Sequence, residues 1–311
     1  MRRCSNDASE RPVCAFLRTL NPHNGHSAGH YMELNRRPFP VCYQQRMKLF
    51  SALACTVIAA SGLQAHAFLF DGGTTIMYQP RIGGQLNGSN FTGANLNGRT
   101  MNNAQFVNCN MTNTSLQGAH APRAHFADSR LYRTNMSRAH LEEARFTELT
   151  LDEIQANQID APALNMMEVV IARSNFSDAS LVAANLAGVD VSESNFRKVK
   201  FISAHLADVH FDTSNLNESD FSAASLTDVG FVNVDLTQAS FIGATLADVD
   251  FNAVILGDVS FLDARMFDIR FENAEGLTQA SFEGACGVSV RGLPEGVTLP
   301  VCQYSGFSAE D

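Results

Sequence analysis

Residues 246–261 read LADVDFNAVILGDVSF, and their spacing decides the fold. Large residues recur every five positions, as Leu246, Phe251, Leu256 and Phe261, and a valine stands two places before each of the last three. A helix returns to its buried face every 3.6 residues and a strand every 2, so neither element accounts for a count of five. A short extended side followed by a corner does account for it.

The five-residue count continues through most of the chain. From residue 86 to residue 271, every position whose number ends in 1 or 6 is Leu, Phe, Met, Ile or Val, apart from Ala121, Ala156 and Ala161. The residue two places earlier is usually small, and the other three are mostly polar. Four such sides close a coil of 20 residues, and stacked coils pair backbone to backbone at about 4.8 Å. The sequence therefore predicts an all-β solenoid.

Four pentads show the repeat most clearly: ANLNG at 94–98, SNFSD at 174–178, ANLAG at 184–188 and SNLNE at 214–218. They resemble the A-(D/N)-L-x-x unit of the pentapeptide-repeat family. The resemblance implies a right-handed quadrilateral β-helix of about nine coils over residues 86–275, and the hand comes from the resemblance alone. Some members of that family resemble a DNA duplex in size and negative charge and bind a topoisomerase.

Aromatic residues alternate with leucines in the C-terminal half. From Phe201 to Phe261 the repeat centres read Phe, Leu, Phe, Leu without exception, which is a period of ten residues. In a coil of 20 residues this period places Phe on two opposite sides. We therefore expect two columns of stacked rings along the axis.

The middle of the repeat, residues 149–169, reverses the usual sizes. Ile154 and Ile159 take the small position, while Ala156 and Ala161 take the large one. Two outcomes are open, a bulged or kinked middle with a projecting loop, or a plain coil with swapped sizes. Pro122 and Pro162 follow centres directly, where a corner accepts the fixed φ of proline.

The N-terminal region has the pattern of an export signal. Residues 47–67 combine a positive start, an apolar run over 49–60 and a small-x-small ending, which predicts a signal peptide cut after Ala67. The run is too short to stay as a transmembrane anchor, so no such segment is expected in the mature chain. Residues 1–46 show no apolar period, and we interpret them as a disordered or misassigned extension.

Both ends of a strand stack must be covered. We expect residues 68–85 to form the N-terminal cap and residues 276–311 the C-terminal cap and tail. In an oxidising compartment Cys286 and Cys302 are the natural disulfide pair, whereas Cys109 occupies a small inward position and should remain a buried thiol. No long amphipathic helix follows the repeat, so we expect a monomer.

The charge pattern restricts the partners. A formal net charge of −10 argues against a protein that binds nucleic acid directly, because such proteins need clustered Lys and Arg. Residues 201–260 contain nine acids and no Lys or Arg. Asp208, Asp228, Asp248 and Asp268 are 20 residues apart and should form one column.

Like charges in such a column repel, so the aspartates need an explanation. One hypothesis is a divalent cation such as Ca²⁺, or a basic partner surface. The other is that each Asp accepts a hydrogen bond from its own corner backbone. His120 and His140 should stack in adjacent coils, with His125 on the neighbouring side of the coil. We expect no carboxylate beside these histidines, so we interpret them as surface residues.

No arrangement of residues in the sequence indicates catalysis or a cofactor, because a nucleophile needs a base and an orienting group within reach. We therefore expect a non-enzymatic, exported scaffold or protein-binding surface in the periplasm or outside the cell. The flank from Asp208 to Asp268 is the expected contact for a partner whose identity the sequence does not give. The alternative is an acidic DNA mimic that binds a topoisomerase in the cytoplasm, and the signal at 47–67 counts against it.

Overall fold

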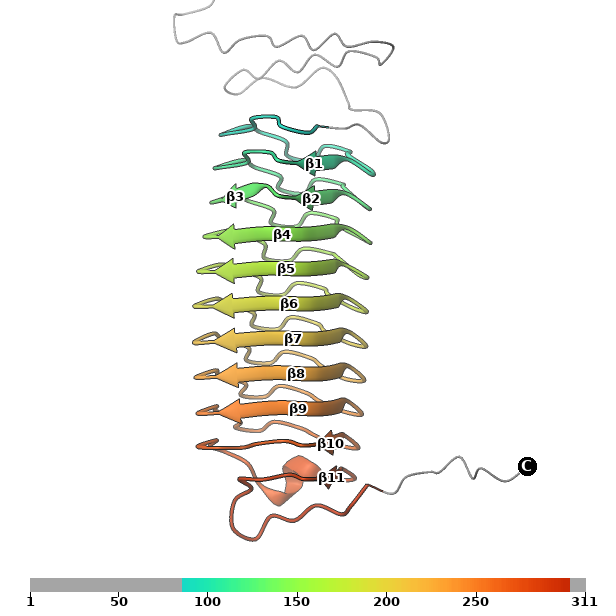
Figure 1. The fold of residues 1–311 in the computed structure, drawn as a ribbon, viewed down its shortest axis with the longest axis vertical. Coiled ribbons are helices and arrows are strands. Elements are labelled where there is room, and N and C mark those ends of the chain that lie inside the picture. Colours follow the sequence, from blue (N-terminus) through green and yellow to red (C-terminus); the bar gives the residue numbers. More distant parts are fainter. Residues whose placement is uncertain (1–85, 303–311) are drawn as a thin grey trace, which may run out of the picture. The chain divides into compact units, whose positions relative to one another are not determined.

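A computed structural model describes residues 86–302, which form a single stack of parallel strands (Figure 1). The predicted extension at 1–46, the signal at 47–67, the N-terminal cap at 68–85 and the tail from 303 lie outside the described residues. Within the described part, no helix is long and apolar enough to cross a membrane.

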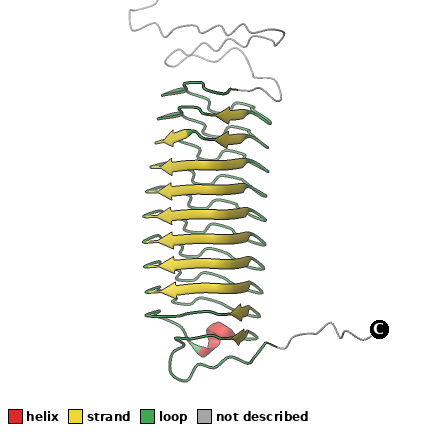
Figure 2. Ribbon diagram, in the orientation of Figure 1, coloured by secondary structure: helices red, strands yellow, loops and turns green. Residues whose placement is uncertain are grey.

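The strands lie directly above one another from coil to coil, and β2 and β3 share one coil (Figure 2). Their sheet order is β1-β2-β4-β5-β6-β7-β8-β9-β10-β11, and β3 pairs with β4. The bounds are β1 Gln105–Val107, β2 His125–Ala127, β3 Arg130–Tyr132, β4 Arg145–Asp152, β5 Asn165–Ala172, β6 Asn185–Ser192, β7 His205–Asp212, β8 Ser225–Val232, β9 Thr245–Asn252, β10 Arg265–Phe267 and β11 Cys286–Val288, with a 3₁₀ helix, η1, at Gln279–Phe282.

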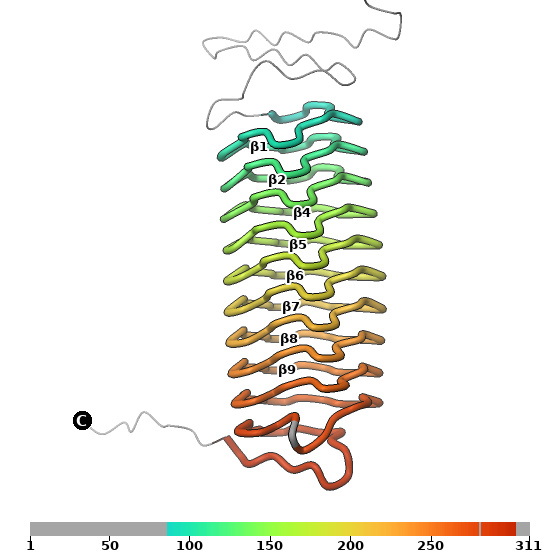
Figure 3. Tube along the Cα trace, turned by 180° about the vertical axis from the view of Figure 1, so that it is seen from behind, coloured from blue at the N-terminus to red at the C-terminus, as the bar shows by residue number. Residues whose placement is uncertain are grey.

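The register confirms a coil of 20 residues. Leu206 pairs with Leu226, and Leu226 pairs with Leu246. Isolated bridges such as Asn95 to Ser115 keep the same step on the other sides of the coil. Seen from behind, the coils follow one another at the same spacing (Figure 3). Positions 20 apart therefore form columns along the described stack as far as β10.

Each coil turns four corners, and each corner has a residue in the left-handed region. In the coil that begins at Phe201, Ser203, Asp208, Thr213 and Glu218 have φ of 56°, 55°, 47° and 57°. Gly adopts this conformation freely, and Asn and Asp adopt it more readily than other residues. The four corners make the coil a quadrilateral, as the family resemblance implies.

At several corners an Asn or Asp directly before the centre shapes the turn that follows. The side-chain Oδ1 of Asn215 accepts a hydrogen bond from the backbone N–H of Asn217 at 2.9 Å, and Asp235 does the same for Thr237 at 3.0 Å. Because these N–H groups bond to a side chain, the inter-coil ladder does not use them. Proline is accepted at the same position, as at Pro162, where the corner still closes through Leu164 N–H to Ala161 O at 3.2 Å.

At a second kind of corner, buried serine hydroxyls accept hydrogen bonds from backbone N–H groups of the preceding coil. The N–H of Ser174 donates to Oγ of Ser194 at 3.0 Å, and the N–H of Ser194 donates to Oγ of Ser214 at 3.1 Å. All three serines are buried. A buried N–H needs a partner, so the small inward position here prefers a hydroxyl to a methyl group.

Two aromatic columns fill the axis, as predicted. Phe221 and Phe241 stack with ring centroids 4.8 Å apart, and Phe231 and Phe251 stack at 5.1 Å in the other column. Rings of the two columns meet edge to face, as between Phe231 and Phe241 at 6.3 Å and 84°. Offset stacking and edge-to-face contacts are the favoured aromatic geometries.

The middle of the repeat is a plain coil. β4 and β5 pair over their full lengths, from Arg145 with Asn165 to Asp152 with Ala172. Ile154 and Ala156, whose sizes are exchanged, are both buried. Of the two outcomes left open, the plain coil with swapped sizes is therefore the one observed, and the bulged or kinked middle with a projecting loop is not, because the large and small positions share one interior and exchanging them conserves its volume.

The repeat changes phase by one residue near its C-terminal end. Arg265 pairs with Cys286, which is 21 residues away instead of 20. Gly276 lies where the extra residue enters, with a φ of 91°, and a Cβ there would stand 2.8 Å from the N of Gly257. Phe282 resumes the aromatic column 5.3 Å from Phe261. The shift keeps the core filled in the last turn.

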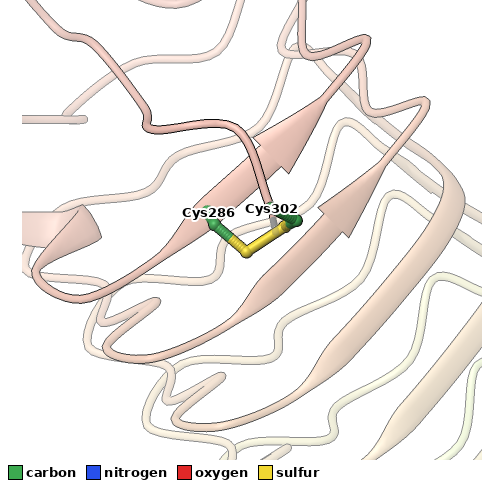
Figure 4. Close-up of a disulfide and its surroundings, with 2 residues drawn as sticks. All are labelled: Cys286 and Cys302. Atoms are coloured by element: carbon green, nitrogen blue, oxygen red, sulfur yellow. A yellow bond between two sulfur atoms is a disulfide. The ribbon is translucent and has the colours of Figure 1, made fainter. Parts of the chain in front are cut away.

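The C-terminal segment contains the predicted disulfide. Cys286 in β11 joins Cys302 with an S–S distance of 2.01 Å (Figure 4). Cys109 is a buried free thiol, as expected, and burial raises its pKa. β11 pairs with β10, so this segment continues the stack. Its role as a cap stays a prediction.

We predict that Phe231→Ala lowers the free energy of unfolding by about 4 kcal/mol, because it opens a cavity inside a continuous aromatic column. Denaturant unfolding followed by circular dichroism measures the change. Ile242→Ala is the matched control, since that side chain is 41% exposed and its truncation should cost less than about 0.5 kcal/mol. Equal effects of the two substitutions would contradict a stacked aromatic core.

Candidate functional site

The long strands β5 to β9 each pass a corner of the coil. In β7, Leu206 and Val209 point inward while Ala207 and Asp208 between them both point outward. Two outward residues in succession break the alternation of a straight strand, and Asp208 has the left-handed φ of a corner. The side chain of Asp208 therefore projects from an edge of the rod.

Acidic residues occupy this corner along almost the whole described stack. We call the column the acidic ridge, and it consists of Asp128, Glu148, Glu168, Asp208, Asp228, Asp248 and Asp268. All seven are exposed and have positive φ, and Gly188 occupies the one position between them that is not acidic. The four aspartates predicted to align do align, and three further carboxylates extend their column toward the N-terminus.

Basic residues are absent from the strands around the C-terminal part of the ridge. β5 to β9 contain no Lys or Arg, whereas Asp190 and Asp250 add outward carboxylates beside the ridge. The stretch ends at Arg145 in β4 and Arg265 in β10. Among ion pairs within residues 86–302, only the contact of His210 with Asp208, at 3.4 Å, includes a ridge carboxylate.

Several acids on other sides of the stack are paired with bases one coil away. Arg123 contacts Glu143 at 2.9 Å, and Arg133 contacts Glu153 at 2.7 Å. Hydrogen bonds from Arg133 and from the Tyr132 hydroxyl hold the pKa of the Glu153 carboxyl below its usual range. The ridge differs from these paired acids because, within residues 86–302, six of its seven carboxylates have no ion-pair partner.

Two acids of the Lys/Arg-free segment have structural roles. Glu218 is paired with Arg197 and Lys198 of the preceding coil. Asp235 is partly buried, which opposes its ionisation, but hydrogen bonds from Thr237 and Asn217 outweigh that effect and hold its pKa below the usual range. These residues are not available to a partner in the way that the ridge carboxylates are.

The histidines partly correct the sequence interpretation. The rings of His120 and His140 stack at 4.5 Å, as expected, and His125 contacts Gln105 and Thr147. The expectation that His140 has no carboxylate neighbour was wrong. Glu142 and Asp160 both lie within 4.0 Å of its Nδ1, because Asp160 follows His140 by one coil.

The Ca²⁺ hypothesis for Asp208, Asp228, Asp248 and Asp268 stays a prediction. If these exposed carboxylates bind Ca²⁺, CaCl₂ raises the melting temperature more than NaCl of equal ionic strength, because the ion binds the folded column only. Replacing Asp228 and Asp248 with Asn should abolish the difference, and Asn suits the left-handed corner. No heat on calorimetric titration of the wild type with Ca²⁺, together with an unchanged melting temperature, would end the hypothesis.

Comparisons with known proteins agree with the geometry. The family description "Pentapeptide repeat region" matches residues 83–156, 99–176 and 204–282, and "Pentapeptide repeats (8 copies)" matches residues 174–212. No curated protein matches the chain.

Two solved structures are similar to this chain at low identity. HetL, a pentapeptide repeat protein involved in heterocyst differentiation regulation from the cyanobacterium Nostoc sp. strain PCC 7120, is 16% identical with a TM-score of 0.45, over 68% of this chain and 90% of its own. Full-length QnrB1, a plasmid-mediated fluoroquinolone resistance protein, is 14% identical with a TM-score of 0.28, over 66% of this chain and 94% of its own. From the family matches and the repeat geometry, the chain belongs to the pentapeptide-repeat family.

Proposed function

We propose that this protein is a non-enzymatic, exported scaffold in the periplasm or outside the cell, and that its acidic ridge binds a basic protein partner. One observation carries the proposal. The ridge carboxylates are exposed, repeat at one corner of successive coils with only Gly188 between them and, apart from Asp208 beside His210, have no ion-pair partner within residues 86–302. A surface without internal compensation attracts an external counter-charge.

The fold supports a role in binding because it fixes the spacing of the charges. Each coil is hydrogen-bonded to its neighbours on all sides, as at Leu216 N–H to Asp235 O at 2.8 Å and Phe201 N–H to Asp220 O at 2.7 Å. The carboxylates therefore stand on a rigid backbone, and a partner loses little free energy in ordering it. Such complementarity gives specificity and fast association more than raw affinity.

The interior supports a non-enzymatic role. Stacked Phe and Leu side chains fill the axis of the coils, so a ligand meets the outward side chains only. The ridge itself contains carboxylates in water, without the nucleophile, base and orienting group that hydrolytic sites combine.

The rival hypothesis uses the same ridge. An acidic DNA mimic that binds a cytoplasmic topoisomerase would also present a regular column of carboxylates. The two hypotheses differ in compartment, so the N-terminus of the protein in its natural host separates them. A mature chain that begins at Phe68 in an exported fraction supports the scaffold, and an uncleaved cytoplasmic chain supports the DNA mimic.

We predict that replacing Asp208, Asp228 and Asp248 with Asn weakens partner binding by about tenfold or more, because it removes the centre of the ridge. The matched control replaces Asp178, Asp258 and Asp263, which are exposed acids with the same left-handed φ at other corners.

The partner is captured from an envelope fraction by the wild type, purified, and titrated with both variants at low and high salt. The ridge variant should lose affinity and salt dependence, while the control should stay within about twofold of the wild type. Equal losses in the two variants, or wild-type affinity in the ridge variant, would contradict the proposal.

A further inference from the structure

A cluster of metal-ligating side chains lies away from the acidic ridge. Nδ1 of His140 stands 3.6 Å from Oε1 of Glu142 and 3.7 Å from Oδ2 of Asp160. One ligand atom from each residue lies within 4.8 Å of the others, and within residues 86–302 no other three His, Cys, Asp or Glu residues meet this condition. The geometry is compact enough for all three atoms to contact one ion.

The backbone holds the three residues in place from two adjacent coils. His140 and Asp160 form a parallel bridge, in which Leu141 N–H donates to Asp160 O at 2.7 Å. Glu142 lies in the corner closed by Ala144 N–H to Leu141 O at 3.0 Å. Only the three side chains therefore need to move for all of them to bind one ion.

Within residues 86–302, His140 is the only basic residue that forms an ion pair with Glu142 or Asp160. The nearby guanidinium of Arg123 is bound to Glu143, at 2.9 Å. Pro122 and Pro162 occupy the positions one coil before and one coil after Glu142, so its own column brings no cation. The side chains of His140, Glu142 and Asp160 are 41%, 37% and 50% exposed, which leaves them accessible to an ion from solution.

We propose that His140, Glu142 and Asp160 bind a divalent first-row transition metal ion, with Zn²⁺ as the expected occupant. One imidazole nitrogen and two carboxylate oxygens suit Zn²⁺, and water completes its tetrahedral shell. Imidazole is not among the oxygen ligands that Ca²⁺ and Mg²⁺ select, so the histidine directs the site toward transition metals. His120 stacks on the His140 ring at 4.5 Å and acts as a positioning residue.

Calorimetric titration of the full chain with Zn²⁺ tests the proposal. The wild type should show one binding event that His140→Ala and Asp160→Asn each weaken by about tenfold or more, because each removes a ligand. His210→Ala is the matched control, since His210 contacts a single carboxylate, Asp208, and its removal should leave the event unchanged.

A second variant separates ligation from stacking. His120→Phe keeps an aromatic ring over His140 but removes the nitrogens, so it should retain Zn²⁺ binding within about threefold if His120 only positions its neighbour. Circular dichroism of each variant checks that the stack is intact. The proposal is overturned if the wild type binds no Zn²⁺, or if folded His140→Ala binds it with wild-type affinity and stoichiometry.

Discussion

The structure depends on the hydrogen-bonded ladder that joins each residue to the one a full coil away. The ladder stays in register where successive coils contain the same number of residues and turn their corners at the same places, and the one extra residue near Gly276 is taken up between two coils. Left-handed residues such as Asp208 and Asp228 make those corners at positions 20 apart. The backbone is then satisfied between coils, and the side chains fall into columns that face either the axis or the solvent.

Columns explain both the stability and the surface of this protein. Inward columns of Phe fill the axis, and the change of phase at Gly276 shows how strongly that filling is maintained, since Phe282 returns to the column after one extra residue. Outward columns repeat whatever chemistry the sequence places at a given corner. The acidic ridge, the Arg–Glu pairs and the His–carboxylate cluster are three such outcomes, and they occupy different positions in the coil.

Most of the fold follows from the sequence because its period can be counted. The Phe–Leu alternation after Phe201 predicts the aromatic columns, and the cysteine positions predict the disulfide. The shape of the middle could not be decided, because the exchange between Ile154 and Ala156 preserves interior volume, which a count of sizes does not reveal. The shift at Gly276 also escaped, since one extra residue ends the numerical pattern without ending the stack.

The candidate site could be predicted only in part. Four aspartates 20 apart are conspicuous, but Glu148 and Glu168 continue their column in a different residue type, and Gly188 interrupts it. The carboxylates beside His140 were missed because Asp160 takes the place of a histidine in the next coil. Both features would appear if columns were compared by charge and ligand type instead of residue identity.

The distance between Glu148 and Asp268 tests the coil directly. These ridge residues are 120 residues, and therefore six coils, apart, which corresponds to about 29 Å at about 4.8 Å per coil. Spin labels introduced at both positions and measured by pulsed electron paramagnetic resonance should give one narrow distribution near that value, widened by the label arms. A broad distribution, or a mean distance that does not fit six coils, would contradict the 20-residue coil and the ridge built on it.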